Sequence, residues 1–321
     1  MDELPIEIVT LIFSYACLDN GYTGRSLSLV SKSIRDLSQH FKLQSISIIG
    51  YNQLQSFASL LAETPPSFRR VRFLFIAAHA RNTAEDPRVL DSEYQRKEDA
   101  YKAYERVLWS VRDTVEMLHV FFIFYRSFLL VPVDLPVLTE LALHGRMDMD
   151  GPTGIKIHNG LRLPALKHLY ITSPFPPRHI TSGLTVLTPA LEHLRLSVPD
   201  HVESFLSELQ HVLQYLASCT DAAETGAHAQ SETSVLRLKT VLLHCPSKPK
   251  DNWMNRMDRY DEQMRLLHEL VSEHARTGLV KLVSPLKMGL FRTVTIEDAE
   301  GSWNARVNGR DAWWEDGFRG L

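Results

Sequence analysis

The residues of this chain whose side chains could perform chemistry are mainly its fourteen histidines and three cysteines. Their spacings build no known kind of active site, because the sequence lacks H-E-x-x-H, C-x-x-C, G-x-S-x-G, G-x-x-x-x-G-K-[ST] and G-x-G-x-x-G. The segment DMDG (148–151) begins like a calcium loop but has no later acidic ligand, so it is predicted to be a polar turn. The sequence therefore predicts no catalytic residue, no metal site and no cofactor. An enzyme would need a deep pocket of converging titratable groups, which the sequence does not indicate.

Composition and charge narrow the class of protein. Of the 321 residues, 44% are hydrophobic and 23% are charged, which is typical of a globular chain. The formal net charge of -3 disfavours nucleic acid and anionic membranes as main partners. The N-terminus does not resemble a secretory signal, and the most apolar window (120–133) is short and interrupted by Arg126. Cys17, Cys219 and Cys245 have no paired spacing. We expect a soluble intracellular protein, cytoplasmic or nuclear, with reduced thiols.

Two helical patterns open the chain. Between residues 4 and 16, apolar residues recur at helical spacing, with Pro5 suited to the first turn and Glu7 suited to the positive end of the helix dipole. The stripe consists of Ile8, Val9, Ile12, Phe13 and Ala16. A second stripe follows the turn-rich segment 19–24 and consists of Leu27, Val30, Ile34, Leu37 and Phe41. Two short helices bury little surface alone, so this unit must pack on the rest of the chain or on a partner.

A repeated pattern, x-P-x-L-x-x-L-x-L, occupies the middle of the chain. The segments 135–143, 163–171 and 188–196 align without gaps, and their middle leucines Leu138, Leu166 and Leu191 are 28 and 25 residues apart. These offsets are typical of leucine-rich repeats, in which a strand and a helix form each unit and neighbouring units stack. Looser copies are predicted at 43–48, 68–73, 115–120 and 238–243, with helical stripes at 90–111, 205–216 and 260–274 and a last strand at 279–283. The C-terminal tryptophans, Trp303, Trp313 and Trp314, are predicted to cover the end of the array.

Residues between the buried leucines of such strands point to the concave face. Histidine, arginine and aromatic side chains there favour protein recognition, while the alternative is that these positions simply face water. The histidines in these positions could make partner binding pH-dependent. Their arrangement in a line disfavours a metal site. The predicted partner-binding residues are Arg70, Arg72, His119, Phe121, Glu140, His144, His168, Tyr170, His193 and Arg195, with His244 in an equivalent position.

The N-terminal segment closely resembles an F-box motif over residues 3–40, through L-P-x-E-I-V-x-x-I-F-S-Y and, after a loop, L-x-L-V-S-K-x-x-R (27–35). Together with the repeats, the chain resembles the fungal F-box proteins with irregular repeats. The resemblance implies docking on the Skp adaptor, which connects to a cullin, through Leu4, Pro5, Ile8, Ile12, Leu29, Val30 and Lys32. Three departures occur: Ile34 replaces the usual tryptophan, Ala16 replaces the usual leucine, and the loop after Cys17 is longer and more polar.

The expected architecture is therefore of the α/β class. It comprises an all-α, F-box-like helical module (1–42), an irregular leucine-rich-repeat solenoid (43–300) and a C-terminal cap (301–321). The expected function is non-catalytic: a substrate receptor of a Skp-cullin-F-box ubiquitin ligase, with an unknown protein as its target. The alternative is a leucine-rich protein-binding scaffold without a ligase link, in which residues 1–42 only cap the first repeat.

Overall fold

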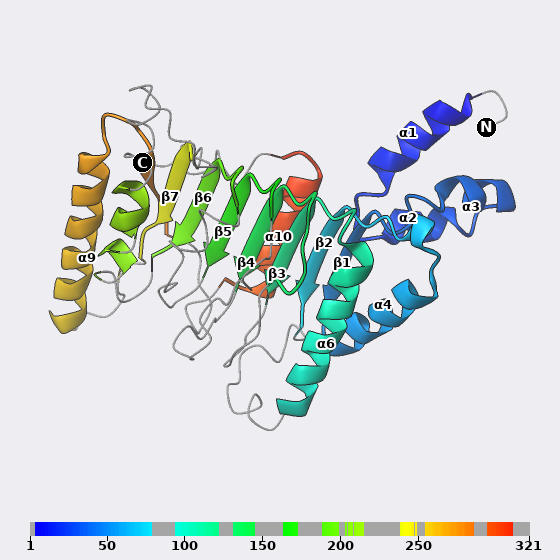
Figure 1. The fold of residues 1–321 in the computed structure, drawn as a ribbon, viewed down its shortest axis with the longest axis horizontal. Helices are drawn as coiled ribbons and strands as arrows, with labels where there is room; N and C mark the ends of the chain where they lie inside the picture. The colour runs from blue at the N-terminus through cyan, green and yellow to red at the C-terminus, as the bar shows by residue number, and fades with distance from the viewer. Residues whose placement is uncertain are drawn as a thin grey trace, which may run out of the picture. The chain divides into compact units, whose positions relative to one another are not determined.

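A computed structural model of the chain describes twelve stretches of the sequence, shown as coloured ribbon in Figure 1. They are residues 4–78, 94–121, 131–144, 163–172, 188–198, 203, 205–207, 209–214, 238–246, 248, 254–285 and 294–310. The chain divides into two compact units, residues 1–123 with 295–314 and residues 124–294 with 315–321. Helices and parallel strands occur in both units, so the α/β class is confirmed.

The first unit begins with three short helices and continues with strands and helices in alternation. Its elements are α1 (Ile6–Ala16), α2 (Tyr22–Leu27), α3 (Lys32–Ser38), β1 (Ser45–Ile49), α4 (Tyr51–Glu63), the 3₁₀ turn η1 (Pro66–Phe68), β2 (Phe73–Ala77), α6 (Tyr94–Val111), β3 (Met117–Phe121) and α10 (Ile296–Val307). The strands lie in the order β1-β2-β3 and are parallel.

The predicted second helix, which would carry the stripe from Leu27 to Phe41, is two helices. Helix α2 ends at Leu27, residues 28–30 form turns, and α3 begins after the extended Ser31, whose hydroxyl accepts the backbone N–H of Ile34 at 3.2 Å. Serine at this position satisfies one of the free N–H groups of a new helix, which is why the helical pattern is interrupted here.

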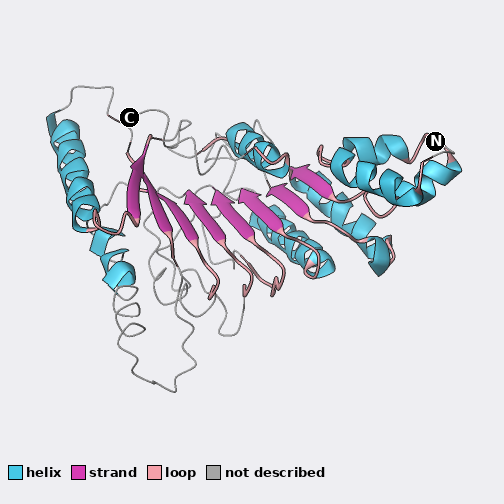
Figure 2. Ribbon diagram, turned by 90° about the horizontal axis from the view of Figure 1, so that it is seen from above, coloured by secondary structure: helices cyan, strands magenta, loops and turns pink. Residues whose placement is uncertain are grey.

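Helices cover both faces of the strands of the first unit, as Figure 2 shows, with α10 on one side and α4 and α6 on the other. The indole of Trp303 in α10 lies against Phe75 of β2, with ring centroids 5.9 Å apart, and the hydroxyl of Ser47 in β1 donates to Glu300 at 2.7 Å. The predicted role of Trp303, covering the end of the array, is therefore wrong, because this side chain packs on the first strands. Trp313 and Trp314 lie outside the described residues.

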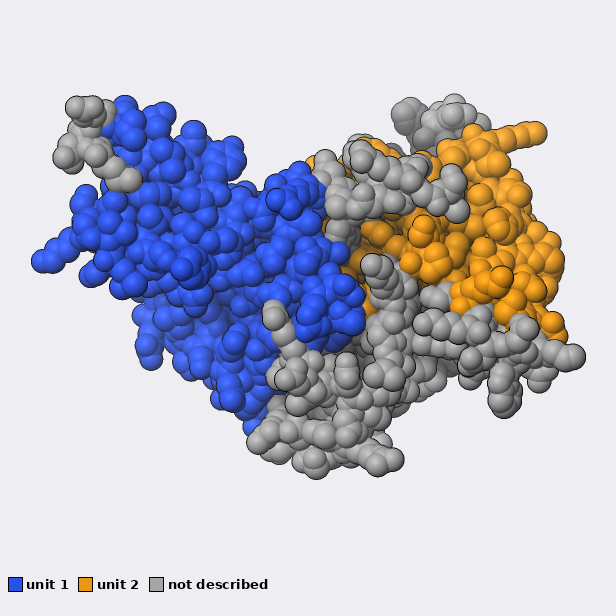
Figure 3. All heavy atoms as spheres, turned by 180° about the vertical axis from the view of Figure 1, so that it is seen from behind, with its two compact units in different colours: residues 1–123, 295–314 blue, residues 124–294, 315–321 orange. Residues whose placement is uncertain are grey.

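The second unit contains five parallel strands in chain order and a long helix. They are β4 (Glu140–His144), β5 (His168–Thr172), β6 (His193–Ser197), β7 (Thr240–His244), α9 (Met254–Glu273) and β8 (Val280–Val283). Helical residues occur also between 203 and 214, where the predicted apolar stripe is buried from Phe205 to Leu213; its last member, Leu216, lies outside the described residues. Figure 3 colours the two units separately.

The alignment of the three gapless repeat copies is confirmed by the strand register. Leu141 pairs with Leu169 and Leu169 with Leu194, while Leu138, Leu166 and Leu191 are completely buried. Each copy enters its strand through the same turn, in which the leucine N–H bonds the carbonyl three residues earlier. The proline of x-P-x-L is the second residue of that turn, where its fixed φ angle is suitable. In the described part of the chain, no helix is long and apolar enough to cross a membrane.

Candidate functional site

Helix α1 has two apolar sides, of which the protein buries one. Val9 and Phe13 point into the first unit and are 5% and 2% exposed. Ile8 and Ile12, which belong to the same predicted stripe, are 44% and 49% exposed, and Ala16 is exposed as well. The predicted stripe is thus divided between an internal contact and a surface open to solvent.

The exposed apolar side chains concentrate in this part of the chain. Twelve large apolar side chains of the described residues are exposed, and nine of these twelve lie between Leu4 and Val30. We call seven of them the N-terminal apolar face: Leu4, Ile8, Leu11, Ile12 and Tyr15 of the α1 segment, with Leu29 and Val30 of the turn before α3. Single exposed apolar residues are ordinary on a protein surface, but a group of this kind indicates an interaction site.

Every residue that the sequence predicted for adaptor binding has an accessible side chain. Leu29 and Val30 are 81% and 64% exposed, and Pro5 and Lys32 are exposed too. Leu11 and Tyr15 were not among the predicted residues; they lie one turn apart beside Ile8 and Ile12 and enlarge the N-terminal apolar face. A search for apolar residues at spacings of three and four along the second side of the helix would have found them.

Hydrogen bonds attach the helical module to the first strand. The side-chain amide of Gln44 donates to the carbonyl of Ser14 at 2.7 Å, and the hydroxyl of Ser45 donates to the carbonyl of Leu18 at 3.3 Å. Asp19 accepts the backbone N–H of Thr23 at 3.0 Å and so stabilises the start of α2. These contacts orient α1 and leave the N-terminal apolar face outside.

The predicted partner-binding row has the expected register in the second unit. Glu140, His168 and His193 are directly paired across β4, β5 and β6, and Tyr170 is paired with Arg195. The side chains differ in accessibility, however. His119, Phe121, Glu140, His144 and Tyr170 are all at least 95% buried and cannot contact a partner in this conformation. His168, His193, Arg195 and Arg72 are half-buried, and Arg70 is exposed.

Arg70 and Arg72 precede the strand to which the sequence assigned them. The predicted copy at 68–73 placed Val71 in the middle of the strand, but β2 begins at Phe73, and Phe73, Phe75 and Ala77 occupy the row that faces α10. The predicted register is therefore wrong by three residues. Arg72 instead forms two hydrogen bonds of 2.8 Å with the carboxylate of Glu116.

A polar cluster lies on the strand face of the second unit, at the positions predicted for His144, Tyr170, Arg195 and His244. The ring of His144 meets Thr172 at 3.0 Å, and the ring of Tyr170 packs edge-on against His144 with centroids 5.3 Å apart. The guanidinium of Arg195 lies 5.0 Å from the Tyr170 ring centre. We call His144, Tyr170, Thr172, Arg195 and His244 the strand-face cluster. Thr172 was missed because its only sequence signal is its place in the row.

Histidine 244 is held in one neutral form by its two neighbours. The Nε of Arg195 donates to His244 Nε2 at 2.7 Å, so this ring nitrogen must accept, and Nδ1 donates to the carbonyl of Ser284 at 2.8 Å. Burial, followed by the positive charge of Arg195, lowers the pKa of His244 to about 3. His244 therefore carries no charge between pH 5.5 and 7.5 and cannot make partner binding pH-dependent in that range.

The titration of His244 predicts a pH dependence of stability. The unfolded chain binds a proton at this ring below about pH 6.5 and the folded chain does not, so the free energy of unfolding decreases as the pH falls from 6.5 towards 3. The free energy of unfolding is expected to change by up to about 1.4 kcal/mol per pH unit. Urea unfolding of wild type and His244→Gln over this pH range measures it, and the variant should lack this part of the slope. If the free energy of unfolding depended on pH equally in both proteins, His244 would not be the group that titrates.

The thiols offer no nucleophile among the described residues. Burial, with a smaller contribution from Asp19, raises the pKa of the Cys17 thiol to about 11, so the thiol stays protonated at neutral pH. The described residues contain no cluster of histidine, cysteine and carboxylate side chains that could hold a metal ion. Cys219 lies outside them.

No protein-family model matches the chain, and no curated protein or solved structure matches it either. Function therefore has to be inferred from the residues and their geometry.

Proposed function

We propose that this protein is a substrate-recognition subunit of a Skp-cullin-F-box ubiquitin ligase, with the N-terminal apolar face as the surface that binds the Skp adaptor. The observation that carries the proposal is the concentration of exposed large apolar side chains between Leu4 and Val30. All seven residues selected by the resemblance to the F-box motif have accessible side chains. The protein would be non-catalytic, and the transfer chemistry would belong to the other subunits.

The geometry of α1 suits docking on another protein. Ile8, Ile12 and Tyr15 of α1 follow one another at intervals of four and three residues, which is the arrangement of anchors in a helix that lies in an apolar groove, and Leu4 lies just before the helix. Burying this surface is favourable by about 25 cal/mol per Å² of apolar area. Lys32, also exposed, adds a cation near the start of α3.

Two sequence departures reduce the area available to an adaptor. Ala16 is exposed and presents only a methyl group where the motif usually has leucine. Ile34 is half-buried and smaller than the usual tryptophan. We therefore expect weaker adaptor binding than a typical F-box provides. The exposed Leu11 and Tyr15 supply apolar area that partly offsets this loss.

A binding experiment with purified Skp adaptor tests the proposal. The double variant Ile8→Asp, Ile12→Asp is expected to lose at least tenfold in affinity, because both side chains lie in the N-terminal apolar face and neither belongs to the core. Val137→Asp is the matched control, since Val137 is exposed in the second unit and should leave adaptor binding unchanged. Circular dichroism establishes that all variants are folded. Failure of the folded wild type to bind the adaptor would refute the proposal.

The second candidate function is a protein-binding scaffold without a ligase link. The observation in its favour is the attachment of the helical module to β1 through Gln44 and Ser45, which is what a simple N-terminal cap would require. In both cases the accessible part of the predicted partner-binding row in the second unit is formed by His168, His193 and Arg195. The rings of His168 and His193 are stacked there, with centroids 4.9 Å apart and planes 5° from parallel.

A further inference from the structure

The first strand of the first unit has an edge that no other described strand covers. β1 pairs with β2 along one side. The carbonyl of Gln44 accepts from Phe73 and the N–H of Gly50 donates to Ala77, so the even-numbered residues from 44 to 50 point their backbone groups towards β2. Successive residues of a strand direct their backbone N–H and C=O groups to opposite sides. The backbone groups of Ser45, Ser47 and Ile49 therefore point away from β2.

Neighbouring groups protect the two ends of this edge and leave its centre open. Gly21 approaches the carbonyl of Ser45, since a Cβ on this glycine would lie 3.5 Å from that oxygen. At the other end, the N–H of Ile49 donates to the side chain of Gln53 at 3.2 Å. Within the described residues, nothing pairs with the backbone N–H or C=O of Ser47. An unpaired strand edge of this kind is a template for an additional strand.

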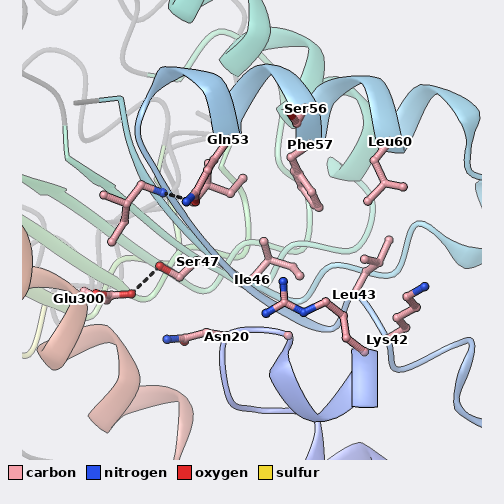
Figure 4. Close-up of a pocket in the computed structure, with 14 residues that line it drawn as sticks. Asn20, Lys42, Leu43, Ile46, Ser47, Gln53, Ser56, Phe57, Leu60 and Glu300 are labelled. Atoms are coloured by element: carbon pink, nitrogen blue, oxygen red, sulfur yellow. Dashed lines mark hydrogen bonds between the residues drawn. The ribbon is translucent and has the colours of Figure 1, made fainter. Parts of the chain in front are cut away.

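A groove runs along this edge. Its volume is about 990 Å³, and we call it the β1 groove. Figure 4 shows Gln53, Phe57 and Leu60 of α4 on one side, Asn20 on the opposite side, and Ile46 and Ser47 of β1 between them. The wall is apolar at Leu43, Ile46, Ile48, Phe57 and Leu60. An extended peptide therefore finds both backbone hydrogen-bonding groups and apolar contacts for alternate side chains.

Polar groups in the β1 groove indicate the chemistry of the peptide. Arg25 and Lys42 line it, and neither side chain pairs with a carboxylate among the described residues. Among the described residues that line the groove, Glu300 is the only acidic one; it accepts from Ser47 and lies at the opposite end from Lys42 in Figure 4. A ligand carboxylate would pair with the two cations.

We propose that the β1 groove binds an extended acidic peptide, which adds to β1 as a further strand by pairing with Ser47. Its acidic side chain lies at the end formed by Arg25 and Lys42, and its apolar side chains contact Ile46, Phe57 and Leu60. The proposal does not depend on the ligase function, because the β1 groove contains none of the seven residues predicted for adaptor binding.

Selection from a library of random heptapeptides displayed on phage, with the intact chain immobilised, tests this proposal. We expect enrichment of peptides that alternate apolar residues and carry at least one aspartate or glutamate. The most enriched sequence is then synthesised with and without N-methyl groups on its backbone, and its affinity is measured by fluorescence polarisation. N-methylation should weaken binding at least tenfold, because it removes the backbone donor that pairs with the carbonyl of Ser47.

Two variants of Ser47 separate backbone pairing from other effects. Ser47→Pro removes the outward N–H without disturbing the ladder to β2 and should weaken peptide binding at least tenfold. Ser47→Ala removes only the hydroxyl that donates to Glu300 and should change affinity less than threefold. The double variant Arg25→Glu, Lys42→Glu should shift the enriched peptides from acidic to basic. Absence of enrichment, or binding that is insensitive to Ser47→Pro, would overturn the proposal, as would self-association of the chain that Ser47→Pro abolishes.

Discussion

Replacing Trp303 by alanine is expected to lower the free energy of unfolding of the first unit by about 3–5 kcal/mol. The indole is completely buried and lies against Phe75, which is also completely buried. Its removal leaves a cavity between α10 and the strands β2 and β3. The rigid strands cannot move to fill this cavity. Urea unfolding followed by circular dichroism measures the loss.

Two matched variants establish the cause of this effect. Trp109→Ala makes the same chemical change at a position that is 54% exposed, and it should alter the free energy of unfolding by only about 0.5 kcal/mol. Trp303→Phe should cost less than Trp303→Ala, because it keeps most of the ring and removes an indole N–H that has no acceptor among the described residues. Equal effects of Trp303→Ala and Trp109→Ala would show that α10 does not stabilise the strands.

Replacing Gly24 by alanine is expected to destabilise the helical module by about 3 kcal/mol, the upper part of the range for overpacking. Gly24 lies in α2, and a Cβ on it would lie 2.7 Å from the carbonyl oxygen and 2.8 Å from the Cα of Lys42. Both are backbone atoms, so no side chain can move aside, and α2 has to separate from the segment that leads into β1. Thermal or urea unfolding of the variant measures the loss.

The matched control for Gly24→Ala is Gly301→Ala in α10. Outside its chain neighbours and the backbone of its own helix, no heavy atom of the described residues lies within 4 Å of a Cβ at Gly301. Alanine favours the helix over glycine by about 1 kcal/mol, so this variant should be as stable as the wild type or more stable. A Gly24→Ala protein with wild-type stability would mean that α2 does not contact residue 42 as the structure shows. If the Gly24→Ala variant also lost adaptor binding while the second unit stayed folded, the adaptor surface would be assigned to the intact module.

The regular parts of the fold were predictable because each depends on local spacing. The leucines of the three gapless copies, Leu138, Leu166 and Leu191, are buried where the pattern placed them, and the strands β4, β5 and β6 follow in the predicted register. The helical stripe predicted from residue 90 to 111 corresponds from Tyr94 onwards to α6, in which Tyr104 and Leu108 are completely buried, while residues 90–93 lie outside the described residues. Such patterns are visible in a sequence because side chains of one element return to the same side at a fixed interval.

The looser copies were less predictable. In the segment 68–73, Phe68, Val71 and Phe73 satisfy the same spacing as Val71, Leu74 and Ile76, and only the pairing of β2 with β1 and β3 decides between them. Arg70 and Arg72 were assigned to the strand for this reason. A shift of three residues changes which side chains face each layer, and an apolar pattern with two equivalent registers does not specify one.

The α/β class, the strands β4, β5 and β6, the helix α6 and the apolar character of residues 4–16 could be read from the sequence alone, since all of these follow from side-chain periodicity. The tertiary structure alone decided which apolar side chains are covered. Val9 and Phe13 are buried while Ile8 and Ile12 are exposed, although the four differ little in hydrophobicity. Likewise, Phe75 is buried under Trp303, 228 residues later in the chain. Burial depends on which distant segments pack together, and the spacing of residues within one segment does not specify this packing.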